Sequence, residues 1–448
     1  MQKIVTKNYH TIPLNWNKKQ ITKFMNIKPF PEINYIQLSP DAIRDNLVNL
    51  RQITFEVTDA CNLKCKYCGY GEFYGDYDKR ENSNFPIHKA YLLLDYLSDY
   101  WLSEMNMSIN RHIYISFYGG EPLLNMDFIQ KIIEYINKKN ISNRHFTFSM
   151  TTNAMLLDKY MDYLITHDFN LLISLDGNRN NNDYRVDKSG ESSFDKIFKN
   201  IQLLQQTYPE YFKNKVDFNA VLHDKNTYES IYNFIKKEFD KIPRISEINP
   251  TGIRDDMKEA FKNTYRNSLK SLYQSKNYQV IEKEMFIKSI IYQNLTTFLH
   301  KYSGFVFRDY NDLLYEQKSV QTLPTGTCVP FARTMFVTVN GKILPCERIG
   351  HQYALGYISN VDVKIDFETI AQRYNQYYKK FTNQCKTCYS KYACTQCIFT
   401  MDDLETSCNC YDYMNSSEFE KFVEGHFQFL SKHPEDYYRI MEEITVDY

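Results

Sequence analysis

The feature that most constrains the fold is a regular alternation of strand-like and helix-like segments between residues 51 and 252. Short segments rich in β-branched and aromatic residues are separated by amphipathic stretches, one of which starts near Pro86 and places Leu93, Leu97 and Trp101 four residues apart. Six such β/α units predict an α/β fold with a parallel sheet, curled as a partial (β/α)6 TIM barrel. The predicted strands are 53–57, 113–117, 146–150, 171–175, 216–222 and 245–249.

Three cysteines, Cys61, Cys65 and Cys68, directly follow the first predicted strand in the stretch TDACNLKCKYCGY. Chemistry in a parallel barrel takes place at the C-terminal ends of the strands, so we expect this loop at the barrel mouth. A tetrahedral zinc site or a cubane iron–sulfur cluster takes four ligands, so three thiols leave one position open. A zinc site completed by a distant histidine such as His88 is the structural alternative.

Composition excludes several classes of protein. The 54 basic and 54 acidic residues balance, which gives no bulk electrostatic case for a nucleic acid or an anionic membrane as partner. No segment approaches the roughly 20 apolar residues of a membrane span, and the first residues lack the apolar core of a secretory signal. We therefore expect a cytoplasmic protein whose eleven cysteines are metal ligands or redox groups rather than disulfides.

The loop CNLKCKYC, with the aromatic Tyr67 before its last cysteine, resembles the radical S-adenosylmethionine (SAM) superfamily. The resemblance implies a 4Fe–4S cluster held by the three cysteines, with the remaining iron chelated by the amino and carboxylate groups of SAM. It further implies that reduction of the cluster cleaves SAM and gives a 5′-deoxyadenosyl radical, while the protein positions the cofactor and excludes water. The open position of the loop is then the cofactor site.

Other motifs match this family one at a time. YGGEP at 118–122 resembles its GGEP motif, which implies that Glu121 holds the SAM amino group, while Gly119 and Gly120 permit the close backbone approach. Four more residues match family positions that face SAM or the substrate, and Arg185 among them suits the SAM carboxylate. For each of the four, a loop cap or a surface role is the alternative. They are Asn153, Ser174, Asp176 and Arg185.

Eight cysteines are clustered between residues 328 and 410. Paired zinc sites are one interpretation, but the gap between the two CxxC pairs is shorter than in zinc ribbons. GKILPC and CKTCYSKYAC resemble the SPASM domain, which implies two auxiliary 4Fe–4S clusters, although the spacing from Cys394 to Cys397 departs from its pattern. The resemblance assigns Cys328, Cys346 and Cys397 to the first cluster, and Cys385, Cys388 and Cys394, with Cys408 or Cys410, to the second. The spare terminal cysteine would then complete the first cluster.

These patterns divide the chain into five predicted parts. The N-terminal extension contains one helix start, Ser39-Pro40-Asp41. The last part is predicted to be a helix with Phe419, Phe422, Val423 and Phe427 on its apolar face. The five parts are an N-terminal extension (1–50), the radical SAM barrel (51–252), a helical connector (253–325), the SPASM domain (326–415) and a C-terminal helix (416–448).

Within SPASM enzymes the chain resembles peptide maturases of the Bacteroidales type, through CGYGEFYGDYDKR after the loop. This implies hydrogen abstraction from a residue of a ribosomally made precursor peptide, leading to a crosslink, a thioether or an epimerised residue. A flavodoxin- or ferredoxin-type protein would be the external electron donor.

Two other functions remain open. Sulfatase maturases, which oxidise Cys or Ser to formylglycine, have an aspartate where this chain has Glu347, a candidate proton acceptor with an ordinary surface role as its alternative. They also place an extra cysteine between the first two SPASM cysteines, and CVPFARTMFVTVNGKILPC has none. The third function is that of a non-catalytic iron–sulfur or zinc scaffold that binds a partner protein.

Overall fold

The computed structural model describes residues 3–5, 11–13, 32–108, 112–139, 141, 144–302, 319–401, 404, 410 and 412–444. The chain separates into two compact units, each made of segments that are distant in the sequence. The barrel unit comprises Ser39–Ile281 and Cys328–Ala371. The helical unit comprises Met1–Leu38, Glu282–Thr327 and Gln372–Tyr448.

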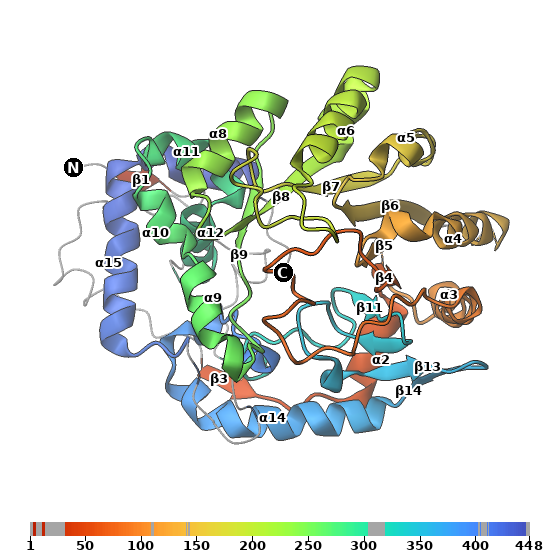
Figure 1. Ribbon diagram of the computed structural model, residues 1–448. Coiled ribbons are helices and arrows are strands. Elements are labelled where there is room, and N and C mark those ends of the chain that lie inside the picture. Colours follow the sequence, from red (N-terminus) through yellow and green to blue (C-terminus); the bar gives the residue numbers. More distant parts are fainter. Residues whose placement is uncertain are drawn as a thin grey trace. The chain divides into compact units, whose positions relative to one another are not determined.

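Parallel strands form the centre of the barrel unit, in the order β4-β5-β6-β7-β8-β9. They curve round with the helices that connect them on the outside, and this confirms the predicted partial barrel (Figure 1). Each predicted strand overlaps one of these elements. They are β4 (Gln52–Thr58), β5 (His112–Gly119), β6 (His145–Thr152), β7 (Asn170–Ser174), β8 (Val216–Leu222) and β9 (Arg244–Glu247).

The two faces of this sheet differ in polarity. Neighbouring strands place Thr54, Ser116, Ser149 and Asn170 opposite one another across four strands. Because successive side chains alternate between the faces, Phe55 points to the other side, where its ring lies 5.8 Å from that of Phe128 in α4. The helix-facing side is therefore apolar, and the inner side of the barrel carries hydroxyl and amide groups.

The helices outside the barrel bury the predicted apolar positions. Leu93, Leu97 and Trp101 of α3 (Ile87–Leu102) are all buried, as the spacing predicted. α2 (Pro40–Val48) begins at the predicted cap, where the Ser39 hydroxyl accepts a hydrogen bond from the Ala42 N–H at 3.1 Å. The other helices of this unit are η1 (Pro122–Asn125), α4 (Met126–Lys139), α5 (Leu157–Thr166), α6 (Phe194–Thr207), α7 (Pro209–Lys215), α8 (Tyr228–Phe239), η2 (Asp255–Met257), α9 (Lys258–Thr264), α10 (Ser268–Tyr273) and η5 (His351–Tyr353).

Four short strands extend the barrel sheet beyond β4, to ten strands in all. β11 pairs with β4 in parallel, with Phe336 opposite Thr54, and the Glu56 carboxylate accepts a hydrogen bond from the Val339 N–H at 2.9 Å. The pairing covers the otherwise open edge of the barrel. The sequence predicts one domain over 326–415. The compact units divide this range, because residues 328–371 belong to the barrel unit and residues 372–415 to the helical unit. The added strands are β11 (Met335–Val337), β12 (Lys342–Leu344), β13 (Gly356–Ile358) and β14 (Val363–Ile365).

The helical unit has its own apolar core. Phe419, Val423 and Phe427 are buried in this core and Phe422 packs against it partly buried, which confirms the predicted apolar face of the C-terminal helix. That helix ends at Lys432, and a second helix follows it. The elements of the unit are η3 (Phe286–Lys288), α12 (Ile290–Thr297), the π-helix η4 (Phe298–Tyr302), η6 (Tyr389–Tyr392), η7 (Ile398–Thr400), α15 (Ser416–Lys432) and α16 (Pro434–Glu443), with α11 (Tyr278–Met285) and α14 (Phe367–Thr387) leading from one unit into the other.

One strand lies where the sequence predicts a helical connector. β10 (Ser319–Thr322) pairs in parallel with β3 (Glu32–Tyr35), so the N-terminal segment is part of the helical unit. Four residues are too few to produce a recognisable period, which explains why the strand was missed. A further antiparallel pair joins β1 (Lys3–Val5) to β2 (Thr11–Pro13). None of the described helices combines the length and the apolar character needed to cross a membrane.

Candidate functional site

The three-cysteine loop lies at the C-terminal end of β4 and is held by a distant segment of the chain. The Lys64 N–H donates to the Val186 carbonyl at 2.7 Å, and the Lys66 N–H donates to the Tyr184 carbonyl at 3.2 Å. Cys68 turns back on the loop, with its N–H 3.1 Å from the Cys65 carbonyl. These bonds fix the backbone on which the three thiols stand.

The loop thiols are close enough to influence one another. Burial raises the pKa of Cys65 to about 12; Arg185 lowers it, and the Cys68 and Cys61 thiols raise it again. Burial likewise raises the pKa of Cys61 to about 11. Binding to a metal cation deprotonates such thiols, so the donor set fits an iron–sulfur cluster. The zinc alternative needs His88, which lies in the first turn of α3. Its Nε2 is instead 3.4 Å from the side-chain oxygen of Asn360.

The two glycines of YGGEP let the end of β5 dock on the backbone that enters this loop. The Gly120 N–H donates to the Thr58 carbonyl at 2.8 Å, and the Glu121 N–H donates to the Ala60 carbonyl at 2.9 Å. A Cβ atom on Gly119, whose φ is +132°, would lie 2.3 Å from the Thr58 oxygen, and one on Gly120 would lie 2.0 Å from the Ala60 oxygen. The glycines are therefore required by the protein's own packing.

Glu121 is buried where β5, β6 and the cysteine loop meet. Its carboxylate accepts hydrogen bonds from the Thr152 hydroxyl at 2.7 Å and from the Asn153 N–H at 2.8 Å. Burial raises the pKa of Glu121 to about 7, although these hydrogen bonds oppose the shift. The Asn153 amide donates to the Asn62 side chain at 2.7 Å and lies 3.8 Å from the Cys61 sulfur. Glu121 and Asn153 are thus gathered beside the loop, as the sequence predicted for a shared site.

Asp176 and Arg185 form a buried ion pair beneath the loop. The guanidinium donates to both carboxylate oxygens, at 3.1 and 3.2 Å, and Tyr67 also donates its hydroxyl to Asp176. Burial acts to raise the pKa of Asp176, but Arg185 and then His223 lower it to about 2. The guanidinium predicted to pair with the SAM carboxylate therefore has a protein partner in this structure. Ser174 is half-buried at the end of β7.

Sequence reasoning missed His223 in this cluster. Its ring stacks on Tyr67 with centroids 5.3 Å apart, and its Nε2 lies 3.6 Å from the Asp176 carboxylate. The residue directly follows β8, where a polar side chain after a barrel strand is a signal for the site.

A cavity of about 460 Å³ occupies the inside of the barrel. Glu347, the predicted proton acceptor, lines it together with Tyr118, Ser116 and Ser149. Burial raises the pKa of Tyr118, and the Glu347 carboxylate and the Cys68 thiol raise it further. Glu347 and the Cys68 thiol therefore both act on the same tyrosine, whose ring lines the cavity.

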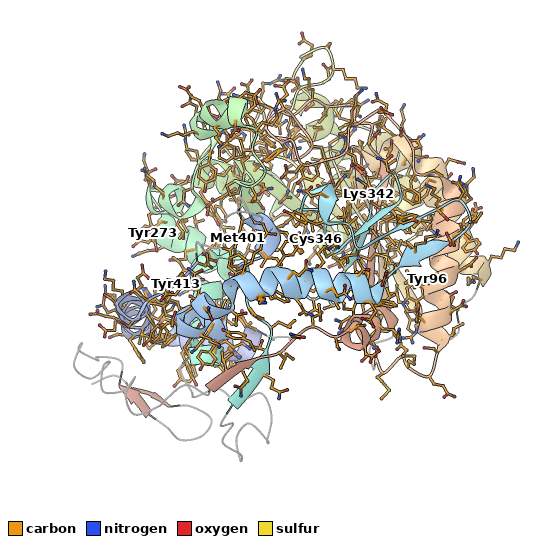
Figure 2. The ribbon with its side chains drawn as sticks, turned by 90° about the horizontal axis from the view of Figure 1, so that it is seen from below. Tyr96, Tyr273, Lys342, Cys346, Met401 and Tyr413 are labelled. Atoms are coloured by element: carbon orange, nitrogen blue, oxygen red, sulfur yellow. The ribbon has the colours of Figure 1, made fainter. Side chains whose placement is uncertain are left out.

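Cys346 is also close to this region of the barrel unit. It follows β12, the strand that contains Lys342 (Figure 2). Burial raises the pKa of Tyr77 to about 12; Asp76, Cys346, Glu347 and Cys68 raise it further, in that order. The Tyr77 ring thus has charged or titratable neighbours from both the cysteine loop and the segment after β12.

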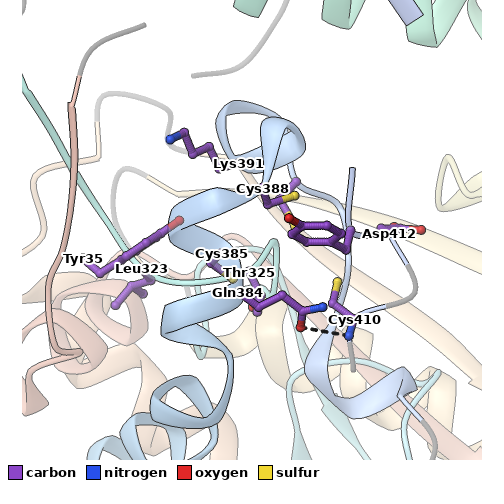
Figure 3. Close-up of a pocket in the computed structure, with 11 residues that line it drawn as sticks. Tyr35, Leu323, Thr325, Gln384, Cys385, Cys388, Lys391, Cys410 and Asp412 are labelled. Atoms are coloured by element: carbon purple, nitrogen blue, oxygen red, sulfur yellow. Dashed lines mark hydrogen bonds between the residues drawn. The ribbon is translucent and has the colours of Figure 1, made fainter. Parts of the chain in front are cut away.

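Four cysteines of the helical unit gather around one small pocket: Cys385, Cys388, Cys394 and Cys410 (Figure 3). The Cys410 N–H donates to the Gln384 side chain at 3.1 Å. Burial raises the pKa of both Cys385 and Cys410 to about 11. Four thiols make a closed donor set, which suits a cluster that leaves no position for a substrate.

The remaining cysteines are distributed over both units. Cys328 is exposed and Cys346 half-buried in the barrel unit, and Cys397 is half-buried in the helical unit. Cys408 lies outside the described residues. The grouping of these four around one cluster stays a prediction.

Comparisons with known proteins agree with this geometry. The profile described as the Radical SAM superfamily matches residues 55–237. A cysteine-type anaerobic sulfatase-maturating enzyme of Clostridium perfringens is 26% identical over 381 residues, 81% of this chain and 94% of that enzyme. The Clostridium novyi enzyme of the same description is 31% identical over 185 residues, which are 40% of this chain and only 46% of that enzyme.

Two further similarities extend the comparison. The radical SAM cyclopropyl synthase TigE of Paramaledivibacter caminithermalis is 25% identical over 216 residues, 47% of this chain and 43% of that enzyme. A solved structure described as native anSMEcpe with bound AdoMet and the Cp18Cys peptide superimposes with a TM-score of 0.51 at 19% identity, over 86% of this chain and 99% of that one. At that identity the likeness concerns the fold.

Proposed function

Because residues 55–237 form a radical SAM domain, we propose that the protein is a radical SAM enzyme that abstracts hydrogen from a residue of a ribosomally made precursor peptide. The observation that carries the proposal is the three-thiol loop after β4 beside buried Glu121, which follows β5 at the same ends of the barrel strands. When bound there, a 4Fe–4S cluster with SAM supplies a carbon-centred radical. Cys61, Cys65 and Cys68 would hold the cluster.

The protein's own residues would bind SAM, position the cysteine loop and separate the reaction from water. Glu121 would accept a hydrogen bond from the SAM ammonium group, and Asn153 would lie beside the bound SAM. The Asp176–Arg185 pair would keep Tyr67 and the loop in place. The barrel cavity would receive the side chain to be modified and separate it from water. Glu347 would accept a proton at its carboxylate when the product forms.

The cysteines of the helical unit support an auxiliary role. We infer that Cys385, Cys388, Cys394 and Cys410 hold one auxiliary 4Fe–4S cluster, and that Cys328, Cys346, Cys397 and Cys408 hold another in a SPASM-type domain. The enzyme would then carry three clusters. Reducing equivalents would come from a flavodoxin- or ferredoxin-type protein in the cytoplasm, where thiols stay reduced.

A second candidate function is the maturation of a sulfatase, by oxidation of a Cys or Ser to formylglycine. It is favoured by the C. perfringens relative, whose similarity spans 94% of that enzyme. Two peptides discriminate between the candidates: a sulfatase-derived peptide and any short peptide that a neighbouring gene encodes. Mass spectrometry of each after incubation with enzyme, SAM and reductant shows which one changes.

The reaction itself is tested by SAM cleavage. Anaerobically reconstituted protein is expected to convert SAM to 5′-deoxyadenosine under reductant, measured by liquid chromatography. Cys61→Ala should abolish this cleavage, whereas Cys385→Ala should leave some uncoupled cleavage and lose the peptide product. A folded, iron-loaded protein that leaves SAM intact would support the scaffold alternative instead. Equal loss of cleavage in both variants would contradict the separate roles given to the two sites.

A further inference from the structure

A second cluster of possible ligands lies in the helical unit, at the corner between α15 and α16. His433, Glu435 and Asp436 each offer one ligand atom, and these atoms all lie within 4.8 Å of one another. Glu282 of α11 interacts electrostatically with Asp436. None of the four belongs to the cysteine sites described above.

Two carboxylates of this cluster are buried with an oxygen that has no partner. Asp436 is 2% exposed; its Oδ2 accepts a hydrogen bond from the Tyr292 hydroxyl at 3.0 Å, but its buried Oδ1 has none. Glu282 is 7% exposed, and its Oε1 is likewise buried and without a hydrogen bond. A buried carboxylate oxygen without a partner is costly, which calls for a ligand that the protein itself does not supply.

Helix capping accounts for only part of the arrangement. Acidic residues are favourable in the first turn of a helix, and Glu435 and Asp436 stand in the first turn of α16. Capping gives no reason for Glu282 to be buried near them. A neighbouring cation, Arg439, is paired with Glu443 at 2.9 Å and donates to the Lys283 carbonyl. His433 and Lys283 act to lower the pKa of Asp436, but no described residue donates a hydrogen bond to its buried Oδ1.

We propose that His433, Glu435 and Asp436 bind a divalent transition-metal ion, for which Zn²⁺ is the probe. An imidazole with carboxylates is a donor set typical of zinc and related ions, whereas Ca²⁺ and Mg²⁺ prefer oxygen ligands alone. The His433 Nδ1 lies 4.0 Å from the Glu435 carboxylate. Two ligand atoms on one tetrahedral zinc are about 3.4 Å apart, given bonds of about 2.1 Å. A small rotation of the exposed Glu435 side chain closes that difference.

The ion would brace the helices that support the four-thiol pocket. Phe286, Tyr292, Tyr437 and Ile440 surround this corner and belong to the core of the helical unit. Partly buried Met414 packs against the same core, and its N–H lies 3.4 Å from the Cys388 sulfur. The role is structural, and it does not depend on the reaction proposed above.

The test uses the full-length protein with its iron already incorporated, so that zinc does not occupy the thiol sites. After incubation with Zn²⁺ and desalting, elemental analysis is expected to find one zinc per chain beyond the iron, with a raised thermal midpoint. His433→Ala and Glu435→Gln change exposed or half-exposed side chains and should still fold. Both should weaken zinc binding roughly tenfold or more, by analogy with the effect of perturbing a metal's surroundings.

Glu442→Gln is the matched control, because it makes the same charge change at an exposed position of the same helix. It should bind zinc as the unmodified protein does, and the iron content should be the same in all variants. The proposal is overturned if the iron-loaded protein retains no zinc and its thermal midpoint is unchanged. It is overturned equally if His433→Ala binds zinc as tightly as the control.

Discussion

Glu121 is a carboxylate in a place where a negative charge is costly. It is 1% exposed, and burial raises its pKa to about 7. The folded protein therefore binds a proton more tightly than the unfolded chain, in which a glutamate titrates near pH 4.3. Its contribution to the free energy of unfolding falls as the pH rises from about 4.3 to about 7, and is constant above that. A cation bound beside Glu121 would reverse this preference.

The first prediction concerns SAM affinity and pH. If the SAM ammonium binds Glu121, binding favours the ionised form, so affinity for SAM should fall as the pH drops below about 7, by up to about tenfold per unit. Calorimetry between pH 6 and pH 8, in buffers of different ionisation enthalpy, should detect release of a proton below pH 7. Glu121→Gln should bind SAM weakly and without this pH dependence. If the affinity of the unmodified protein for SAM did not change with pH, Glu121 would not be the group that binds the SAM ammonium.

At the scale of elements, the site depends on how the end of β5 meets the loop after β4. The meeting is made by backbone hydrogen bonds from Gly120 and Glu121 to the carbonyls of Thr58 and Ala60. No side chain contributes to these two bonds, so the sizes of the residues at positions 119 and 120 control the approach. These two hydrogen bonds join the end of β5 to the start of the cysteine loop.

The second prediction follows from this junction. In Gly120→Ala the new Cβ would lie 2.0 Å from the Ala60 oxygen, so the backbone must move, at a cost of about 1–3 kcal/mol or more. The thermal midpoint should fall and SAM binding should be lost, even where iron is retained. Gly69→Ala is the control, since its Cβ has nothing within 4 Å although it stands next to Cys68. If both variants had the same thermal midpoint and the same SAM binding, the close approach of β5 to the loop after β4 would not be required.

The elements also show which parts of the fold could be predicted from the sequence. β4 to β8 were predictable because alternating burial leaves a pattern in their longer runs of residues and because helices follow them, and β9 was predictable because it continues the same alternation of strands and helices. β11 to β14 have three residues each, so they carry no period. Their position beside β4 is a property of long-range pairing, which no local pattern encodes.

At the scale of the whole molecule, tertiary structure brings together cysteines whose spacing leaves their grouping open. Cys408 and Cys410 are one residue apart, so either could complete the second auxiliary site by the motif alone. The fold brings Cys410 to the pocket lined by Cys385, Cys388 and Cys394. The glutamate, asparagine and loop cysteines were likewise predictable from motifs, but the Asp176–Arg185 pairing and His223 depend on neighbours distant in the chain.

The third prediction tests this assignment. Cys410→Ala should lose as much iron as Cys385→Ala, namely the iron of one cluster, and both should retain SAM binding at the loop cluster. Iron analysis and absorption near 400 nm measure the loss. Lys391→Ala changes a residue that lines the same pocket but offers no thiol, and should keep its iron. Full iron content in Cys410→Ala would mean that another residue completes the site.

The pairing of β4 with β11 has a consequence for how the protein is made. β4, the strand that leads into the cysteine loop, emerges from the ribosome long before Met335–Val337, its partner on the outer side. During that interval a nascent chain presents an unpaired strand edge, which is a template for association with other chains. The same edge would be open in any fragment cut at the end of the matched segment 55–237. The outer side of the first barrel strand is thus covered only by a strand that is synthesised after all the other barrel strands, β5 to β9.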